Sequence, residues 1–205
     1  VPGTGGSDSG TGGSVPGTGG SVPGTGGPYP EVKGSTEPIG MAVYSDDGVE
    51  STTGGNDGPA VVATNSSEFS TYVESSEPLY IIVEGNLSGK FNISSNKTVI
   101  GAGSGATVDG QLSLNNVQNV IIRNFTVSGG SDGISTNYAT HVWIDHCDVS
   151  NCGDGAIDIT DESDYHTVSW TRLHDHHKTM LLNSGTGQPE DADDFNVTLH
   201  HNWWD

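Results

Sequence analysis

Basic residues are scarce in this chain. Only six of its 205 residues are Lys or Arg, whereas 26 are Asp or Glu, which gives a net charge of −20 at pH 7. A nucleic-acid-binding surface is basic, and anionic membranes attract basic segments, so the composition argues against both partners. Two interpretations of the acidity stay open: it keeps the protein soluble, or some of the carboxylates converge on a cation.

Cysteines and long apolar runs are also scarce. Cys147 and Cys152 are the two cysteines, and they either form a local disulfide across a turn or stay free. No run of about 18 apolar residues occurs, so no transmembrane helix is expected. The chain begins with Val and shows no signal-peptide pattern, which fits a mature chain or a fragment.

Six N-x-S/T sequons favour a secreted protein. They begin at Asn65, Asn86, Asn92, Asn96, Asn124 and Asn196.

The beginning of the chain lacks the apolar residues that a core needs. Repeats of VPGTGGS run through residues 1–27. We therefore expect residues 1–30 to be a flexible linker, which either tethers an N-terminal module or is a bare tail. Residues 31–59 predict an irregular approach segment, and the folded domain is expected to cover residues 60–205.

One short helix is expected near the start of this domain. Asn65 followed by Glu68 has the spacing of a capping box. Phe69, Tyr72 and Val73 then form one apolar face at helical spacing, and Pro78 requires the helix to end before it.

The rest of the chain is a series of short β runs, the first being Leu79–Val83. Four segments align as a loose repeat, with starts 22, 24 and 31 residues apart. The segments are VIIRNFTV (120–127), VWIDHCDV (142–149), HTVSWTRL (166–173) and VTLHHNWW (197–204). The alignment predicts two columns of inward residues, namely Ile122, Ile144, Val168 and Leu199, and Val127, Val149, Leu173 and Trp204. One β unit per repeat without helices between favours an all-β solenoid, with a β-sandwich as the alternative.

Polar residues gather between Thr140 and Asn183, which holds six of the eight histidines. Asp154 and Asp158 would lie about 13 Å apart in an extended strand, too far to share an ion. A bend at Gly153 and Gly155 would bring them together as a site for a hard cation; two exposed turn aspartates are the alternative.

The HDHH run at 174–177 suggests zinc, but no further Cys or His spacing completes a tetrahedral site. Histidines that line strands or donate hydrogen bonds near a site are the commoner interpretation. Lys178 follows this run and either pairs locally or meets an anionic ligand.

Several motifs together resemble the pectate lyases over about residues 60–205. They are DGI from Asp132, VWIDH at 142–146, SNCGDGAIDI at 150–159, TVSW at 167–170, HDHHKTMLL at 174–182 and VTLHHNWWD at 197–205. The resemblance implies a right-handed single-stranded parallel β-helix. It also implies a secreted, extracellular enzyme, a monomer when full length, that cleaves de-esterified pectin (polygalacturonate) by β-elimination with Ca²⁺.

The resemblance also implies roles for particular residues. Asp132, Asp154 and Asp158 match the acidic calcium ligands of the family, and Gly130 stands where many members have one more acid. Lys178 matches the lysine that holds a substrate carboxylate. Asp145 and His146 belong to the WIDH signature, which we interpret as scaffold or site support.

Calcium resolves an electrostatic conflict in this assignment. The substrate is a polyanion and the protein carries a net charge of −20. A divalent ion that bridges two sets of carboxylates removes the repulsion and acidifies the adjacent C5 proton of the sugar.

The resemblance breaks at the catalytic base. In the family the base is an arginine in an R-x-P-R-like segment shortly after the strand matching 197–205, whereas this chain ends at Asp205 and neither Arg123 nor Arg172 aligns with it. We therefore expect a β-helix truncated before its C-terminal coils, with no catalytic residue in this chain, little lyase activity, and marginal folding or aggregation in isolation.

Three rival functions remain. A pectin lyase acts on methylated pectin without calcium, and the three aspartates argue against it. A glycoside hydrolase would use two carboxylates and give no ultraviolet-absorbing product. A non-catalytic pectin- or calcium-binding β-helix is left open by the missing arginine.

Overall fold

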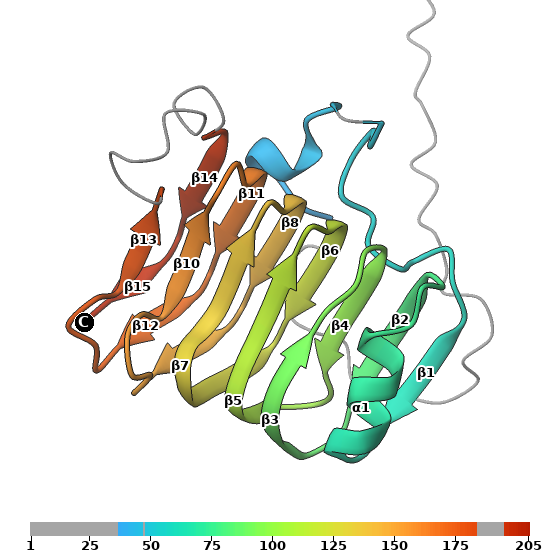
Figure 1. The fold of residues 1–205 in the computed structure, drawn as a ribbon, viewed down its shortest axis with the longest axis horizontal. Coiled ribbons are helices and arrows are strands. Elements are labelled where there is room, and N and C mark those ends of the chain that lie inside the picture. The colour runs from blue at the N-terminus through green and yellow to red at the C-terminus, as the bar shows by residue number, and fades with distance from the viewer. Residues whose placement is uncertain (1–36, 47, 184–194) are drawn as a thin grey trace, which may run out of the picture.

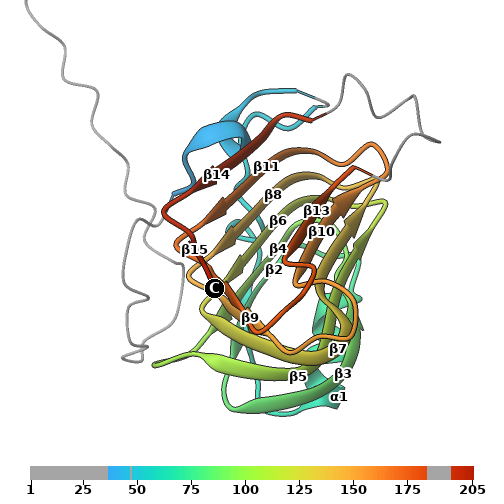
Figure 2. The same cartoon turned by 90° about the vertical axis from the view of Figure 1, so that its left-hand side faces the viewer.

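The structure is a computed structural model that describes residues 37–46, 48–183 and 195–205. The linker predicted over residues 1–30 lies outside the described residues. Short strands wind into two parallel sheets that enclose one apolar core (Figures 1 and 2). The predicted parallel β-helix is therefore confirmed, and every strand pairing is parallel within the described part of the chain. None of the described helices is long and apolar enough to cross a membrane.

The first sheet has seven strands, each contributed by a successive coil. In spatial order they are β1 (Ala60–Ala63), β2 (Leu79–Val83), β4 (Lys97–Gly101), β6 (Gln118–Arg123), β8 (Thr140–Asp145), β11 (Asp164–Ser169) and β14 (Val197–His200).

The second sheet has eight strands and divides after its third. It begins with β3 (Asn86–Asn92), β5 (Ala106–Asn115) and β7 (Phe125–Asn137). One branch continues through β9 (Asp148–Ser150), β12 (Arg172–His174) and β15 (Trp203–Trp204), and the other through β10 (Ile157–Thr160) and β13 (Met180–Leu182). The long strand β7 pairs with β9 through its first half and with β10 through its second half.

The register of both predicted columns is confirmed, whereas Trp204, predicted to point inward, is 48% exposed. Ile122 pairs in register with Ile144, which pairs with Val168, which pairs with Leu199. The second column runs from Val127 through Val149 and Leu173 to Trp204 in the same way. Because identical apolar positions stack from coil to coil, six of these eight side chains have no exposed surface.

The predicted helix is α1 (Ser66–Val73), which packs against β1, β2 and β3 at one end of the solenoid (Figure 1). The Asn65 side chain accepts a hydrogen bond from the Glu68 backbone N–H at 3.0 Å, as expected for the cap. The Glu68 carboxylate accepts the Thr64 N–H at 2.8 Å, so the reciprocal bond falls one residue earlier than in a standard capping box.

An N-terminal strap (residues 37–46 and 48–58) lies across the seven-stranded sheet (Figure 1). It contains the 3₁₀ helix η1 (Gly40–Val43), where the Ala42 N–H donates to Thr167 Oγ1 at 3.1 Å and the Ala42 side chain packs on Trp143. Further along, the Gly54 N–H donates to Asn119 Oδ1 at 2.7 Å. The packed region therefore starts earlier than the expected boundary near Ala60.

Glycines mark the bend that divides the second sheet into two faces. A Cβ on Gly110 would lie 1.9 Å from the carbonyl oxygen of Gly89, and one on Gly130 would lie 2.4 Å from that of Gly110. Only glycine permits such close stacking of backbones from coil to coil. Asp132, which follows this bend on β7, belongs to the polar site described next.

Candidate functional site

Three carboxylates and one ammonium group gather beside this bend. We call them the acidic corner: Asp132 in β7, Asp154 in the loop before β10, Asp158 in β10, and Lys178 in the loop before β13. They come from three successive coils, so the solenoid brings together residues up to 46 positions apart in the sequence.

The bend between Asp154 and Asp158 exists, and backbone hydrogen bonds hold it. The Asp154 N–H donates to the carbonyl oxygen of Ser131 at 2.6 Å, which docks the loop on the coil that carries Asp132. Asp158 Oδ1 lies only 2.6 Å from the position a Cβ would take on Gly155. The extended geometry that would separate the two aspartates therefore does not apply, and a side chain at position 155 would displace the Asp158 carboxylate.

Electrostatics confirm that the four groups are close enough to interact. Burial raises the pKa of Asp158, and the neighbouring charges of Asp132 and Asp154 raise it further. Lys178 Nζ donates a short hydrogen bond to Asp154 Oδ1 and lowers the pKa of that carboxyl, while Asp154 raises the pKa of Lys178. Three carboxylates thus face one ammonium, and the site carries an excess of negative charge.

Gln111 in β5 fixes one of these carboxylates from the coil below. Its side-chain Nε2 donates to Asp132 Oδ2 at 3.3 Å and to Ser135 Oγ at 2.9 Å. Gln111 is buried, so Asp132 has a supporting partner whose own position is restricted. Sequence reasoning missed Gln111, although extending the coil register to β5 would have placed it beside Asp132.

Carboxylate oxygens such as those of the acidic corner are ligands that suit a hard cation. Across residues 37–46, 48–183 and 195–205, however, no group of three or more His, Cys, Asp or Glu side chains is arranged to hold a metal ion. The acidic corner therefore has the donor chemistry of a calcium site, whereas its side chains are not gathered around one point while Lys178 binds Asp154.

One residue of the histidine run at 174–177, His174, contacts two carboxylates. His174 lies between Asp148 and Asp175, with its ring nitrogens 2.8 and 2.7 Å from their oxygens. The hydrogen bond to Asp148 raises the pKa of His174, whereas burial lowers the pKa of His176. This arrangement corresponds to hydrogen bonding along a strand, the commoner of the two interpretations for this run.

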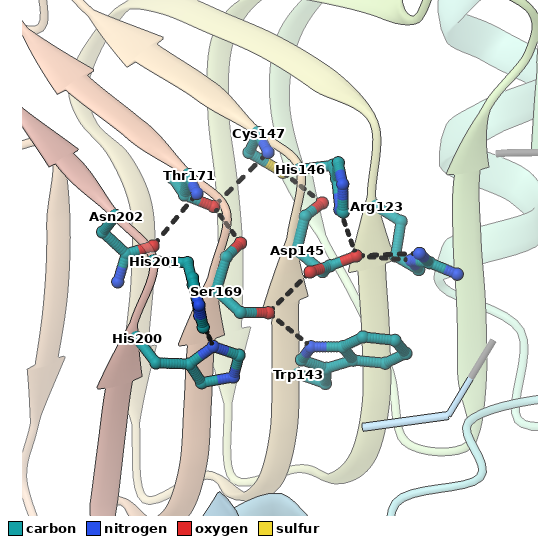
Figure 3. Close-up of polar contacts among 10 residues, drawn as sticks. All are labelled: Arg123, Trp143, Asp145, His146, Cys147, Ser169, Thr171, His200, His201 and Asn202. Carbon is teal, nitrogen blue, oxygen red and sulfur yellow. Dashed lines mark hydrogen bonds and ion pairs between the residues drawn. The ribbon is translucent and has the colours of Figure 1, made fainter. Parts of the chain in front are cut away.

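A second polar cluster surrounds Asp145 on the outer side of the seven-stranded sheet (Figure 3). Asp145 is buried, and Arg123 Nε donates to its Oδ2 at 2.9 Å while Arg123 Nη2 lies 2.8 Å from the same oxygen. His146 Nδ1 is 2.6 Å from that oxygen, and the Ser169 hydroxyl donates to Oδ1 at 2.5 Å. We call Arg123, Asp145, His146 and Ser169, with Trp143, the Asp145 network.

Trp143 contacts two other members of this network, Ser169 and Arg123. Its indole Nε1–H donates to Ser169 Oγ at 2.9 Å, and its ring faces the Arg123 guanidinium at 4.6 Å from the ring centre. The Ser169 hydroxyl is thereby engaged as donor and as acceptor, so it is not available as a nucleophile. The assignment of Asp145 and His146 as scaffold agrees with this geometry, and the pairing with Arg123 follows from the confirmed register one residue beyond Ile122 and Ile144.

Directly after the strands of the seven-stranded sheet that carry the Asp145 network, the backbone takes left-handed angles in successive coils. The φ angles are +60° at Asn124, +50° at His146, +49° at Trp170 and +55° at His201. Asn and His are enriched in this region relative to other residues, whereas Trp adopts it at a cost. The three rings stack with centres 5.9 and 4.3 Å apart, which supplies packing at the corner.

The two cysteines are free. Cys147 is fully buried, and burial raises the pKa of its thiol to about 12. Cys152 is half-buried, and its thiol pKa is also raised. Neither has the exposed, low-pKa character of a reactive thiol.

Comparison with known proteins decides the family. A sequence model described as Pectate lyase matches residues 18–205 of this chain. The chain belongs to the pectate lyase family. The family assignment agrees with its parallel β-helix fold.

Curated relatives are consistent with this family assignment. A pectate trisaccharide-lyase of Thermotoga maritima is 34% identical over 187 residues, which covers 82% of this chain and 51% of that protein. The pectate lyase plyB of Emericella nidulans is 38% identical over 168 residues, or 75% of this chain and 51% of that protein. The chain thus spans about half the length of the curated relatives it matches.

Solved structures share the fold. The major allergen from cedar pollen superimposes with a TM-score of 0.72 at 24% identity, covering 82% of this chain and 57% of the allergen. A pectate lyase of Bacillus sp. N165 in complex with trigalacturonate gives a TM-score of 0.69 at 23% identity, covering 82% and 62%.

Proposed function

We propose that this chain is the calcium- and substrate-binding part of a secreted pectate lyase, an enzyme that cleaves polygalacturonate by β-elimination with Ca²⁺. The observation that carries the proposal is the acidic corner, where three carboxylates and one lysine from successive coils lie near enough to shift one another's pKa. Family membership supports the reaction class, and the titles of solved relatives, one bound to trigalacturonate and one to a hexasaccharide, support the substrate class.

Some residues of the chain would bind the ion, and others would bind the sugar. Asp132, Asp154 and Asp158 would hold calcium, which when bound withdraws charge from the substrate carboxylate and acidifies the adjacent C5 proton. Gln111 keeps Asp132 oriented through its hydrogen bond. Lys178 sits on an exposed loop and would exchange its contact with Asp154 for the substrate carboxylate when an ion neutralises the aspartates.

Neither arginine of the chain is suited to act as the base that takes the C5 proton. Arg123 is buried and paired with Asp145 beneath the strap. Arg172 lies on the branch of β9 and β12, where it contacts Asp205 at 2.7 Å and Asp148 at 3.9 Å. We therefore propose that this 205-residue chain binds calcium and oligogalacturonate with little turnover, which keeps a non-catalytic pectin-binding β-helix as the second candidate.

Two of the six sequons fit glycosylation of a secreted protein best. Asn86 and Asn92 are exposed, whereas Asn65 caps α1 with its side chain and Asn124 donates its side-chain amide to the carbonyl oxygen of Gly101 at 2.7 Å. An engaged amide is a poor acceptor for a glycan, so we expect carbohydrate at the exposed positions.

A calcium titration followed by calorimetry tests the proposal. The wild-type chain should bind calcium saturably, and Asp154→Asn should weaken binding by at least about tenfold, the scale seen on losing even an outer-shell partner of a metal. Asp57→Asn is the matched control, because Asp57 is an exposed aspartate in the strap, on the other side of the molecule. Equal binding by wild type and Asp154→Asn would contradict the site.

Product analysis separates the enzymatic rivals. Incubation with polygalacturonate and calcium should give little ultraviolet-absorbing product from this chain. Rapid formation of unsaturated ends would contradict the assignment of the base, and saturated products would indicate hydrolysis.

A further inference from the structure

Lys90 differs from the other basic residues of the described structure. Four of these are engaged: Lys97 with backbone carbonyls, Arg123 with Asp145, Arg172 with Asp205, and Lys178 with Asp154. Lys90 is exposed and has no hydrogen bond or ion pair in the described part of the chain. In a protein of net charge −20, the exposed ammonium of Lys90 is a place where an anion can bind.

The position of Lys90 in the solenoid links it to the acidic corner. Lys90 follows the glycine bend on β3 and points outward, since its neighbours Leu87 and Phe91 point into the core. It pairs in register with Gln111 on β5, whose side chain donates to Asp132 on β7. Lys90, Gln111 and Asp132 therefore stand at the same edge in three consecutive coils, with Lys90 roughly 10 Å from Asp132 at the usual strand spacing.

The outward column beside Lys90 runs in register from Asn92 through Ser113 and Ser135 to Asp158. Ser113 and Ser135 are themselves buried, with exposures of 2% and 8%, whereas Asn92 at the Lys90 end is exposed. Asp109, on the other side of the bend, is directed at Gly129 of the next coil, 2.3 Å from where a Cβ would stand there. The column therefore places no acidic side chain between Lys90 and Asp158.

We infer that Lys90 is a distal substrate-binding residue, which contacts a uronate carboxylate of a chain held at the acidic corner. The inference rests on the proposed function. Polygalacturonate carries one carboxylate on each sugar, so a chain along the solenoid axis presents charges to the acidic corner and to Lys90 together. Asp132 lies two coils, roughly 10 Å, and Asp158 three coils, roughly 14 Å, from β3, so a digalacturonate held at the acidic corner ends before Lys90 whereas a longer oligomer reaches it.

A purely structural role is the competing explanation. β3 pairs with only one strand, β5, and an exposed lysine on such an edge discourages pairing with another molecule. The two explanations differ in one respect: only a substrate contact depends on the length of the ligand.

Calorimetry with digalacturonate and hexagalacturonate in saturating calcium tests the inference on the 205-residue chain. Lys90→Gln should weaken hexagalacturonate binding by about three- to fivefold, as for an exposed ion pair, and leave digalacturonate binding unchanged. Lys90→Arg should retain the affinity. Ser45→Asp changes the net charge by the same amount on the exposed strap and should affect neither ligand.

The outcomes separate this inference from the function on which it rests. If wild type binds neither oligomer in calcium, the proposed function fails, and the inference fails with it. If wild type binds both and Lys90→Gln weakens both equally or neither, the distal contact is wrong while the proposed function stands. A loss confined to the longer ligand and shrinking at high ionic strength supports Lys90 as a substrate contact.

Discussion

The Asp145 network and the acidic corner use the same residue types to opposite effect. In the Asp145 network the carboxylate has a side-chain exposure of 2%, and Arg123, His146 and Ser169 all contact it. In the acidic corner the Asp154 side chain is 53% exposed, and Lys178, which forms an ion pair with it, is 63% exposed. One cluster is buried and balanced in charge, whereas the other is open and has two carboxylates in excess.

This difference teaches where to look for function in an acidic protein. A buried carboxylate with a complete set of partners has no capacity left for a ligand, and its interactions hold coils together. An open cluster in which burial, together with like charges, raises the pKa of one member stores repulsion that a cation can relieve. The WIDH motif and the aspartates of the acidic corner both carry the resemblance to the family, yet only the second has the electrostatics of a binding site.

Breaking the Asp145 network should give the largest effect on stability. Asp145→Ala leaves the Arg123 guanidinium buried without its counter-charge, so we expect the free energy of unfolding to fall by about 3–5 kcal/mol. Urea unfolding followed by tryptophan fluorescence measures this, with Asp57→Asn as an exposed control expected within about 0.5 kcal/mol of wild type. A loss of less than about 1 kcal/mol for Asp145→Ala would show that the network is not a main source of stability.

Acid should weaken the seven-stranded sheet through a buried histidine. His166 points into the core between Val142 and Val197, and burial lowers its pKa to about 4. Between pH 6.5 and 4 the unfolded chain takes up a proton at this position and the folded chain does not, so stability falls as the pH falls. The expected loss from this residue is about 3 kcal/mol.

The pH dependence of the urea midpoint in His166→Gln checks this. The variant lacks the titrating group, so its stability should fall less steeply between pH 6.5 and 4 than that of wild type, whatever its stability at pH 7. Parallel curves for the two proteins would rule out His166 as the cause.

Local sequence predicted the fold well because a solenoid repeats one physical requirement. Each coil must bury the same positions against the coil below, so Ile122, Ile144 and Val168 could be aligned by pattern alone. The helix at Ser66–Val73 was likewise predictable from its cap and its apolar face. These features depend on residues close in sequence or on strict repetition.

The N-terminal strap and the acidic corner depend on contacts that no local sequence pattern encodes. The strap looks irregular in sequence because it contributes backbone groups, such as the Gly54 N–H that bonds Asn119, and little apolar surface. Gln111 was missed because an isolated Gln has no motif until the register places it beside Asp132. The aspartate spacing suggested a site only if the chain bends, and the bend is fixed by a coil twenty residues earlier, at Gly130 and Ser131.

Altering the acidic corner itself should give the smallest effect on stability and the most informative one on binding. Lys178→Gln removes a partner that competes with calcium for Asp154. Because the ion pair is exposed, its loss should raise calcium affinity by only about two- to threefold. The same change should weaken oligogalacturonate binding in saturating calcium, since the ammonium is then missing from the substrate side. Calorimetry measures both effects on one variant, and opposite signs are the mark of a residue that exchanges partners. If calcium affinity falls instead, Lys178 holds Asp154 in position. The side chains of the acidic corner are then preorganised by their mutual contacts, as those of the Asp145 network are.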